Sequence, residues 1–188
     1  YQSGNSRDYD RRLMRPWHAI FSQIPVWPAL GNHDWKSPPD ANWEREWYLP
    51  NNEHYYSFDY ANAHFICLDS RDGELYDVTN QVAWLEKDLS AHTDADWLFV
   101  YFHHPGITCT YKKNNQAVIK NFLPLFDRYK VDVVFTGHAH TYERLYPVRD
   151  GQTVSVDQDP KYTDPAGTIY ITSGAGGKVK KGKPTGRC

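Results

Sequence analysis

Hydrophobic and polar positions follow two periods along this chain, and each period predicts one kind of element. Apolar runs bounded by turn residues predict six strands, at residues 24–30, 55–60, 64–68, 97–102, 131–135 and 168–172. Apolar residues at helical spacing predict three helices, at residues 9–22, 80–91 and 116–129. Because strands and helices alternate, the sequence predicts an α/β fold built on a layered sheet.

Two of the predicted strands carry nearly unbroken apolar sequence, which is typical of central strands covered on both faces. They span residues 97–102 and 131–135, and both lead directly into histidines. In open α/β sheets, ligand sites lie in the loops beyond the carboxyl ends of the strands. We therefore expect functional residues just after Leu30, Phe102 and Phe135.

The composition narrows the classes of protein to which the chain can belong. A length of 188 residues with 40% hydrophobic and 15% aromatic content predicts one globular domain over 1–188 and excludes disordered and fibrous proteins. The 21 basic and 23 acidic side chains are too balanced for a typical nucleic-acid-binding protein. No apolar run reaches the roughly 18 to 20 residues of a membrane-spanning helix. The basic stretch at 178–184 is predicted to be a solvated tail.

The three cysteines carry neither a structural zinc motif nor a redox motif, since none has C-x-x-C spacing. Cys67 lies inside an apolar run and is predicted to be a buried free thiol. A disulfide between Cys109 and Cys188 is an alternative that the sequence leaves open, and it would favour an oxidising compartment.

Five of the nine histidines fall in three clusters, each just beyond a predicted apolar strand. The clusters are Gly31-Asn32-His33-Asp34, His103-His104-Pro105 and Gly137-His138-Ala139-His140. Neighbouring side chains on a strand point to opposite sides, so only one of His103 and His104 can face a given site. Alone, Gly31-Asn32-His33-Asp34 is also compatible with a turn that carries a surface histidine, and an isolated His-x-His motif is weak evidence of a metal site. The joint occurrence of the three clusters favours a metal site, because imidazole and amide oxygen are common metal ligands.

These motifs, with the Thr141-Tyr142-Glu143-Arg144 extension and the Tyr170–Gly177 segment, resemble the calcineurin-like metallophosphoesterases and, within them, the purple acid phosphatases. The resemblance covers nearly all of the chain. It implies a layered α/β/β/α metallophosphoesterase sandwich and hydrolysis of small phosphomonoesters by metal-bound hydroxide at a dinuclear centre. It also favours a secreted or periplasmic protein.

The resemblance assigns a role to each candidate residue. It makes Asn32, His103 and His138 ligands of one metal ion and His140 a ligand of the other, and it makes Tyr1 a phenolate ligand of the centre. The implied ions are Fe(III) with a divalent ion, either Zn, Mn or Fe. His33 is not a ligand in this pattern; it contacts the phosphate and protonates the leaving oxygen, which suits a group that titrates near neutrality. The resemblance implies that four further residues fix the positions of the loops and bind no metal: Asp34, Tyr142, Glu143 and Arg144.

The chain departs from the family pattern at its front, where it contains neither of the family's two Asp motifs. The resemblance therefore implies a partial, N-terminally truncated catalytic domain. Asn32 and the histidines coordinate as neutral donors, so a dinuclear centre also needs anionic donors. Asp34 and Asp69 are carboxylates that the family pattern does not use in this way. The alternatives are a non-catalytic or single-metal fragment, and a phosphodiesterase on the same fold.

Overall fold

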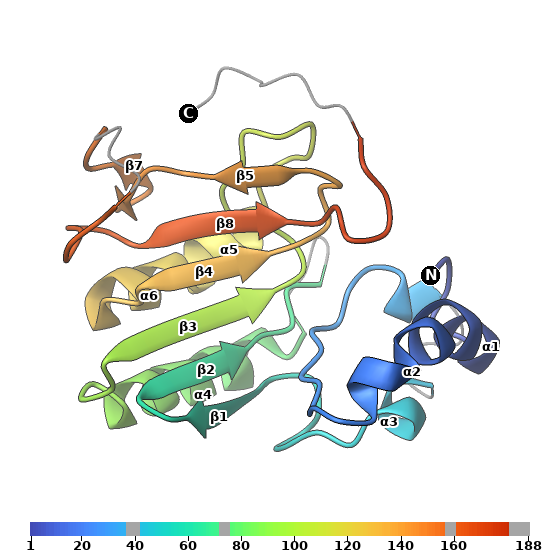
Figure 1. Cartoon of the computed structure of the whole chain (residues 1–188). Coiled ribbons are helices and arrows are strands. Elements are labelled where there is room, and N and C mark those ends of the chain that lie inside the picture. The colour runs from blue at the N-terminus through green and yellow to red at the C-terminus, as the bar shows by residue number, and fades with distance from the viewer. Residues whose placement is uncertain (37–41, 72–75, 157–160, 181–188) are drawn as a thin grey trace.

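The computed structural model describes residues 1–36, 42–71, 76–156 and 161–180. The first part of the chain is helical: α1 (Ser6–Tyr9), a π-helical segment (Asp10–Met14) and α2 (Arg15–Phe21) follow one another without a break. A 3-10 turn (Asp34–Lys36) and the short helix α3 (Trp43–Glu46) come next. The helices α1, α2 and α3 lie beyond one edge of the sheet (Figure 1).

A six-stranded sheet forms the centre of the molecule, in the order β1-β2-β3-β4-β8-β5. Its strands are β1 (Tyr56–Tyr60), β2 (Ala63–Cys67), β3 (Trp97–Phe102), β4 (Val133–Thr136), β5 (Tyr142–Arg144) and β8 (Ile169–Ser173). The inner strands β2, β3, β4 and β8 are parallel, and the edge strands β1 and β5 are antiparallel to their neighbours. The carboxyl ends of the four parallel strands therefore meet at one edge (Figure 1). A separate hairpin consists of β6 (Val148–Arg149) and β7 (Gln152–Thr153).

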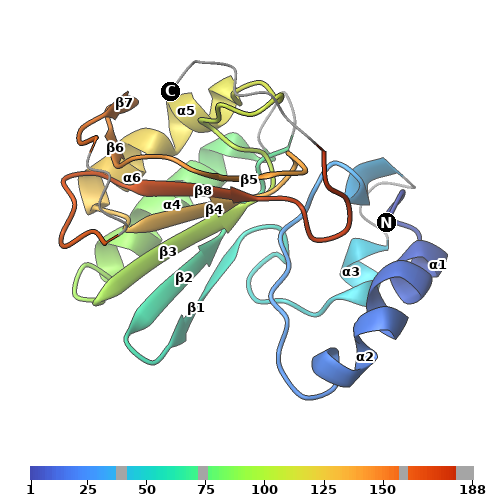
Figure 2. The ribbon, with the colours of Figure 1, turned by 45° about the horizontal axis from the view of Figure 1, so that its top comes forward.

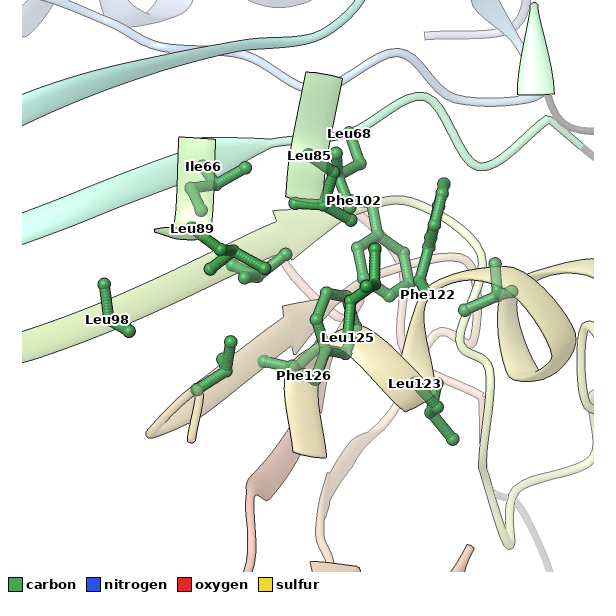
Figure 3. Packing of buried hydrophobic residues seen from close by; sticks show 14 of the residues in the cluster. Ile66, Leu68, Leu85, Leu89, Leu98, Phe102, Phe122, Leu123, Leu125 and Phe126 are labelled. Atoms are coloured by element: carbon green, nitrogen blue, oxygen red, sulfur yellow. The ribbon is translucent and has the colours of Figure 1, made fainter. Parts of the chain in front are cut away.

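Three helices cover one face of this sheet: α4 (Val78–Ala91), α5 (Gln116–Asn121) and α6 (Leu123–Tyr129) (Figure 2). The main core lies between these helices and the sheet (Figure 3). Along β3 burial alternates, so that Leu98, Val100 and Phe102 point into this core. Helices α4 and α6 supply the opposing side chains Leu85, Leu89 and Phe126, and the junction between α5 and α6 supplies Phe122.

The opposite face of the sheet carries no helix among the described residues (Figure 2). Trp97 of β3 is 48% exposed and Phe135 of β4 is 40% exposed. The expectation that these two strands are covered on both faces is therefore wrong for the described part of the chain. The reason lies in the topology. The parallel strands β2, β3 and β4 follow one another in the same direction across the sheet, and right-handed connections between such strands place their helices on the same face.

Five of the six predicted strands form, and the exception is residues 24–30, which pair with no other strand of the described chain. Pro25 and Pro28 lack the backbone donors that a ladder needs. Side chains hold this segment instead, since the Tyr56 hydroxyl donates to the Pro28 carbonyl at 2.6 Å and Trp27 stacks on Phe58 with ring centroids 4.4 Å apart.

The three predicted helices form with altered boundaries. The segment at 9–22 extends back to Ser6, and the predicted helix at 116–129 is broken into α5 and α6. The break falls just before Pro124, which sits in the first turn of α6, where its missing N–H costs least. The pattern did not predict β5, β6 or β7, which are two or three residues long.

The α/β class is confirmed. Of the layers expected for an α/β/β/α sandwich, the described residues form one six-stranded sheet and the α4–α6 helix layer, with the helices of residues 6–21 and 43–46 beyond the sheet and the β6–β7 hairpin apart from it. Cys67 is confirmed as a buried free thiol. The Cys109–Cys188 pairing cannot be described, because Cys188 lies outside the described residues. No helix in the described ranges combines the length and the apolar character needed to cross a bilayer.

Candidate metal centre

The three histidine-bearing loops meet at the carboxyl edge of the sheet. His103 follows β3, and the loop at 137–140 follows β4, the parallel neighbour of β3. The Gly137 N–H donates to the His103 carbonyl at 3.0 Å, which joins the two loops. The Asn32 loop reaches the same place from the segment at 24–30, which forms no regular secondary structure.

Asn32, His103 and His138 turn one donor atom each toward a common point. Asn32 Oδ1 lies 2.9 Å from His103 Nε2 and 3.2 Å from His138 Nδ1, and the two nitrogens are 3.3 Å apart. One amide oxygen and two imidazole nitrogens in a cluster form a donor set that suits zinc, iron or manganese. The described residues therefore fit a first-row transition-metal ion at this point.

Where these donors meet, the backbone needs a glycine at one position and a left-handed conformation at another. A Cβ atom on Gly31 would lie 2.7 Å from His103 Nδ1, so only glycine leaves room for the imidazole. His138 has φ +61°, a left-handed conformation that is uncommon for a residue with a side chain. Such conformations persist where the surrounding structure enforces them, and they concentrate at functional sites.

Burial, followed by the neighbouring His104 and His138, holds the pKa of His103 well below its usual range. The pKa of His140 is also lowered, by burial and then by Lys178, Lys112 and Lys180. A neutral imidazole has a lone pair to offer, so both rings are in the state that metal binding requires.

His140 and His33 line the same cleft as His103, with a cavity volume of about 410 Å³. The buried Nδ1 of His140 has no hydrogen-bond partner among the described residues. His33 Nδ1 lies 2.9 Å from the Gln2 carbonyl oxygen, which can only accept, so this nitrogen carries the proton. These two imidazoles are therefore near the donor cluster but are not members of it.

Tyr1 also lines this cleft, and its hydroxyl donates to the Asp34 carboxylate. Tyr9 donates to the same carboxylate oxygen at 2.5 Å, and the Gly31 N–H donates to the other oxygen at 2.7 Å. Burial, then the charge of Asp34, raises the pKa of Tyr1. Asp34, itself buried, thus ties the first residues of the chain to the Asn32 loop.

His104 lies closer to the cluster than the sequence suggested. One of its ring nitrogens lies within 4.8 Å of ring nitrogens of His103 and His138. Its ring does not line the His33 cleft, however, and its backbone N–H donates to Ser70 Oγ at 2.8 Å. His103 and His104 therefore diverge, as alternation along a strand predicts.

Comparison with known proteins agrees with this geometry. A family model described as calcineurin-like phosphoesterase matches residues 1–142. The chain belongs to the calcineurin-like phosphoesterase family. It is 34% identical to purple acid phosphatase 18 of Arabidopsis thaliana over an alignment 184 positions long, which covers 87% of this chain and 36% of that protein. It is 27% identical to human acid phosphatase type 7, over 92% of this chain and 44% of that protein.

A solved structure shares the fold. The purple acid phosphatase PPD1 from yellow lupin seeds superposes with a TM-score of 0.67 at 24% identity, over 84% of this chain and 30% of that protein. The resemblance to purple acid phosphatases is therefore confirmed. The chain spans between 30% and 44% of the lengths of these three proteins.

In this member of the calcineurin-like phosphoesterase family, Glu143 of β5 anchors the loop that follows His104. Its two carboxylate oxygens accept hydrogen bonds from the Thr108 hydroxyl and the Cys109 N–H, both at 2.7 Å. Sequence reasoning did not single out Tyr111, whose hydroxyl accepts the His140 N–H at 2.9 Å. Only a signal for contact between the 105–115 loop and the 137–140 loop would have identified it.

Proposed function

We propose that this chain carries part of the active site of a metal-dependent phosphomonoester hydrolase. The observation that carries the proposal is the convergence of Asn32 Oδ1, His103 Nε2 and His138 Nδ1 within 3.3 Å at the carboxyl edge of the sheet. The family and the purple acid phosphatase relatives support the same reaction class.

In this proposal Asn32, His103 and His138 would hold one metal ion, His140 would hold the other, and Tyr1 would add a phenolate ligand; the ions would be Fe(III) paired with Zn, Mn or Fe. When bound, such a pair supplies Lewis-acid polarisation of the phosphate and a water of lowered pKa. Tyr1 must exchange its hydrogen bond to Asp34 for the metal in order to serve as a ligand.

His33 acts as the proton donor to the leaving oxygen. Its ring is oriented by the 2.9 Å contact between Nδ1 and the Gln2 carbonyl, and we assign proton transfer to Nε2. The ring lies in the cleft with His103 and His140, where a phosphate bound at the centre would come within its reach.

A second candidate function is the binding of a single metal ion without catalysis. It is favoured by the lack of negative charge among the described donors. Asp34 accepts three hydrogen bonds, from Tyr1, Tyr9 and Gly31, so its oxygens are already engaged. Asp69 is fully buried beside His54 and Arg71. Neither carboxylate is placed to compensate two cations, whereas a single ion needs only the three-donor cluster.

Metal content and turnover measured together separate these functions. We expect about two metal ions per chain by elemental analysis, and faster hydrolysis of phenyl phosphate than of diphenyl phosphate. His33→Ala should depress turnover by about a hundredfold or more and keep the metal, whereas His138→Ala should lose metal. His18→Ala, on the exposed surface of α2, is the matched control.

The other outcomes decide between the readings. One ion per chain without turnover supports the single-metal fragment, and faster diester hydrolysis supports a phosphodiesterase. A chain that retains no transition metal refutes the proposal. Parallel loss of metal and activity in His33→Ala would show that His33 is a ligand and not a proton donor.

A further inference from the structure

Two lysines from distant parts of the chain lie over the ring of Tyr111. Lys112 Nζ is 5.7 Å and Lys180 Nζ is 5.0 Å from the centroid of that ring. A cation within about 6 Å of an aromatic centroid is attracted by the ring quadrupole. One aromatic ring therefore holds two ammonium groups, and we name Tyr111, Lys112 and Lys180 the basic rim.

The basic rim is joined to His140 through both backbone groups of that residue. The His140 N–H donates to the Tyr111 hydroxyl at 2.9 Å. The Lys180 N–H donates to the His140 carbonyl at 2.8 Å, so the segment that follows β8 returns to this edge of the sheet (Figure 1). The two lysines thus have a defined place beside a residue of the candidate metal centre.

The positive charge of the rim is not neutralised within the described part of the chain. Neither lysine has a carboxylate oxygen within 4.0 Å there, whereas five arginines do: Arg12, Arg15, Arg45, Arg71 and Arg128. Lys178 adds a third cation and lines the cleft with His33 and His140. The whole chain has a net charge of -2, so this positive excess is local. Two like charges at one ring repel each other, and an anion beside both relieves the repulsion.

We propose that the basic rim is a subsite for a second anionic group, a carboxylate or a phosphate, carried by the phosphomonoester. The inference rests on the proposed function, because the scissile phosphate occupies the adjacent cleft lined by His33, His103 and His140. It names a substrate class: phosphomonoesters with a second negative group, in preference to esters with a neutral tail. Lys178 and Lys180 then form part of a binding surface, and both are exposed, as expected from the sequence.

The test compares two non-hydrolysable probes that differ by one charge. Calorimetric titration of the full chain, with Zn²⁺ present, measures the affinities for phenylphosphonate and for 4-phosphonobenzoate. We expect 4-phosphonobenzoate to bind at least about fivefold more tightly, and the advantage to shrink as salt rises from about 20 to 200 mM. Lys112→Met combined with Lys180→Met should remove the advantage of 4-phosphonobenzoate over phenylphosphonate. Lys120→Met, an exposed lysine on α5, is the matched control and should keep it.

Equal affinities for the two probes, no measurable binding of 4-phosphonobenzoate, or an advantage that the double variant retains would each overturn the subsite. The result is independent of turnover. A chain that hydrolyses phenyl phosphate without any lysine-dependent preference keeps the proposed function and loses the subsite. A chain that shows the preference and hydrolyses nothing keeps the subsite and loses the function.

Discussion

At the scale of single residues, the candidate centre depends on one missing side chain. Gly31 leaves the space that the His103 imidazole fills, since a Cβ there would lie 2.7 Å from Nδ1, 2.9 Å from Cε1 and 2.9 Å from Cγ. The ring is a rigid obstacle, so the added methyl group must displace either the ring or the Asn32 loop. Either shift separates Asn32 Oδ1 from His103 Nε2, which are now 2.9 Å apart.

We therefore expect Gly31→Ala to weaken Zn²⁺ binding by about tenfold or more, the range found when the residues that position metal ligands are changed. Calorimetric titration with Zn²⁺ measures the effect, and circular dichroism checks that the fold persists. Gly176→Ala is the control, because a Cβ at Gly176 meets no atom within 4 Å. Unchanged zinc affinity in Gly31→Ala would contradict a metal site at this cluster.

Only some of the residues at the candidate site could be predicted from the sequence. The resemblance to purple acid phosphatases predicted Asn32, His103 and His138 as a set, and each lies in a motif beside a predicted strand end. The contacts of Tyr111 and Lys180 with His140 could not be predicted, because these residues lie 29 and 40 positions away from His140 along the chain. The pattern of residues within one segment does not show which distant segment will pack against it.

At the scale of elements, His64 joins three of them through two carboxylates. Its Nδ1 lies 2.7 Å from Asp59 Oδ1 of β1, and its Nε2 lies 2.8 Å from Asp88 Oδ2 of α4. His92, which follows α4, stacks on the His64 ring with centroids 3.6 Å apart. Burial lowers the pKa of His64, but hydrogen bonds to Asp88 and Asp59 outweigh it, so the pKa is raised. The imidazolium therefore ties the β1–β2 hairpin to α4.

The raised pKa fixes the direction of the pH dependence. The stabilisation is fully present below the unfolded pKa of about 6.5 and is lost as the pH rises through the folded pKa. We expect His64→Gln to lower the free energy of unfolding by about 1 to 2 kcal/mol more at pH 5.5 than at pH 8.5. Urea denaturation at the two pH values measures the difference. The control is His18→Gln, and an equal loss for His64→Gln at both pH values would exclude the charged bridge.

Some strands could not be predicted correctly from the sequence, either because of prolines or because the strands are short. The strand expected at 24–30 has the right apolar pattern, but Pro25 and Pro28 remove the donors that pairing needs. The strands β5, β6 and β7 are too short for any periodicity to register. Long elements with an apolar stripe, such as α4, were predicted because tertiary packing selects that stripe.

At the scale of the whole molecule, a stripe of aromatic rings crosses the sheet on the face opposite the helices. Ring centroids are 5.1 Å apart for Phe58 and Phe65, 5.0 Å for Phe65 and Phe99, and 6.2 Å for Phe99 and Phe135. Trp97 stacks on Phe99 at 6.0 Å and is 48% exposed. This aromatic stripe runs from β1 to β4 and is a contiguous apolar surface rather than a set of isolated side chains.

Contiguous exposed apolar surface binds apolar dyes and promotes association, whereas single exposed rings do neither to the same degree. We expect the native chain to enhance the fluorescence of anilinonaphthalene sulfonate, and Trp97→Lys with Phe135→Lys to reduce this enhancement and any concentration-dependent sedimentation. The free energy of unfolding should change by only about 1 kcal/mol or less, because both side chains are substantially exposed. Tyr48→Lys is the matched control, since Tyr48 is 99% exposed and lies outside the stripe. Equal dye binding by the double variant and the parent chain would show that the aromatic stripe is covered in solution.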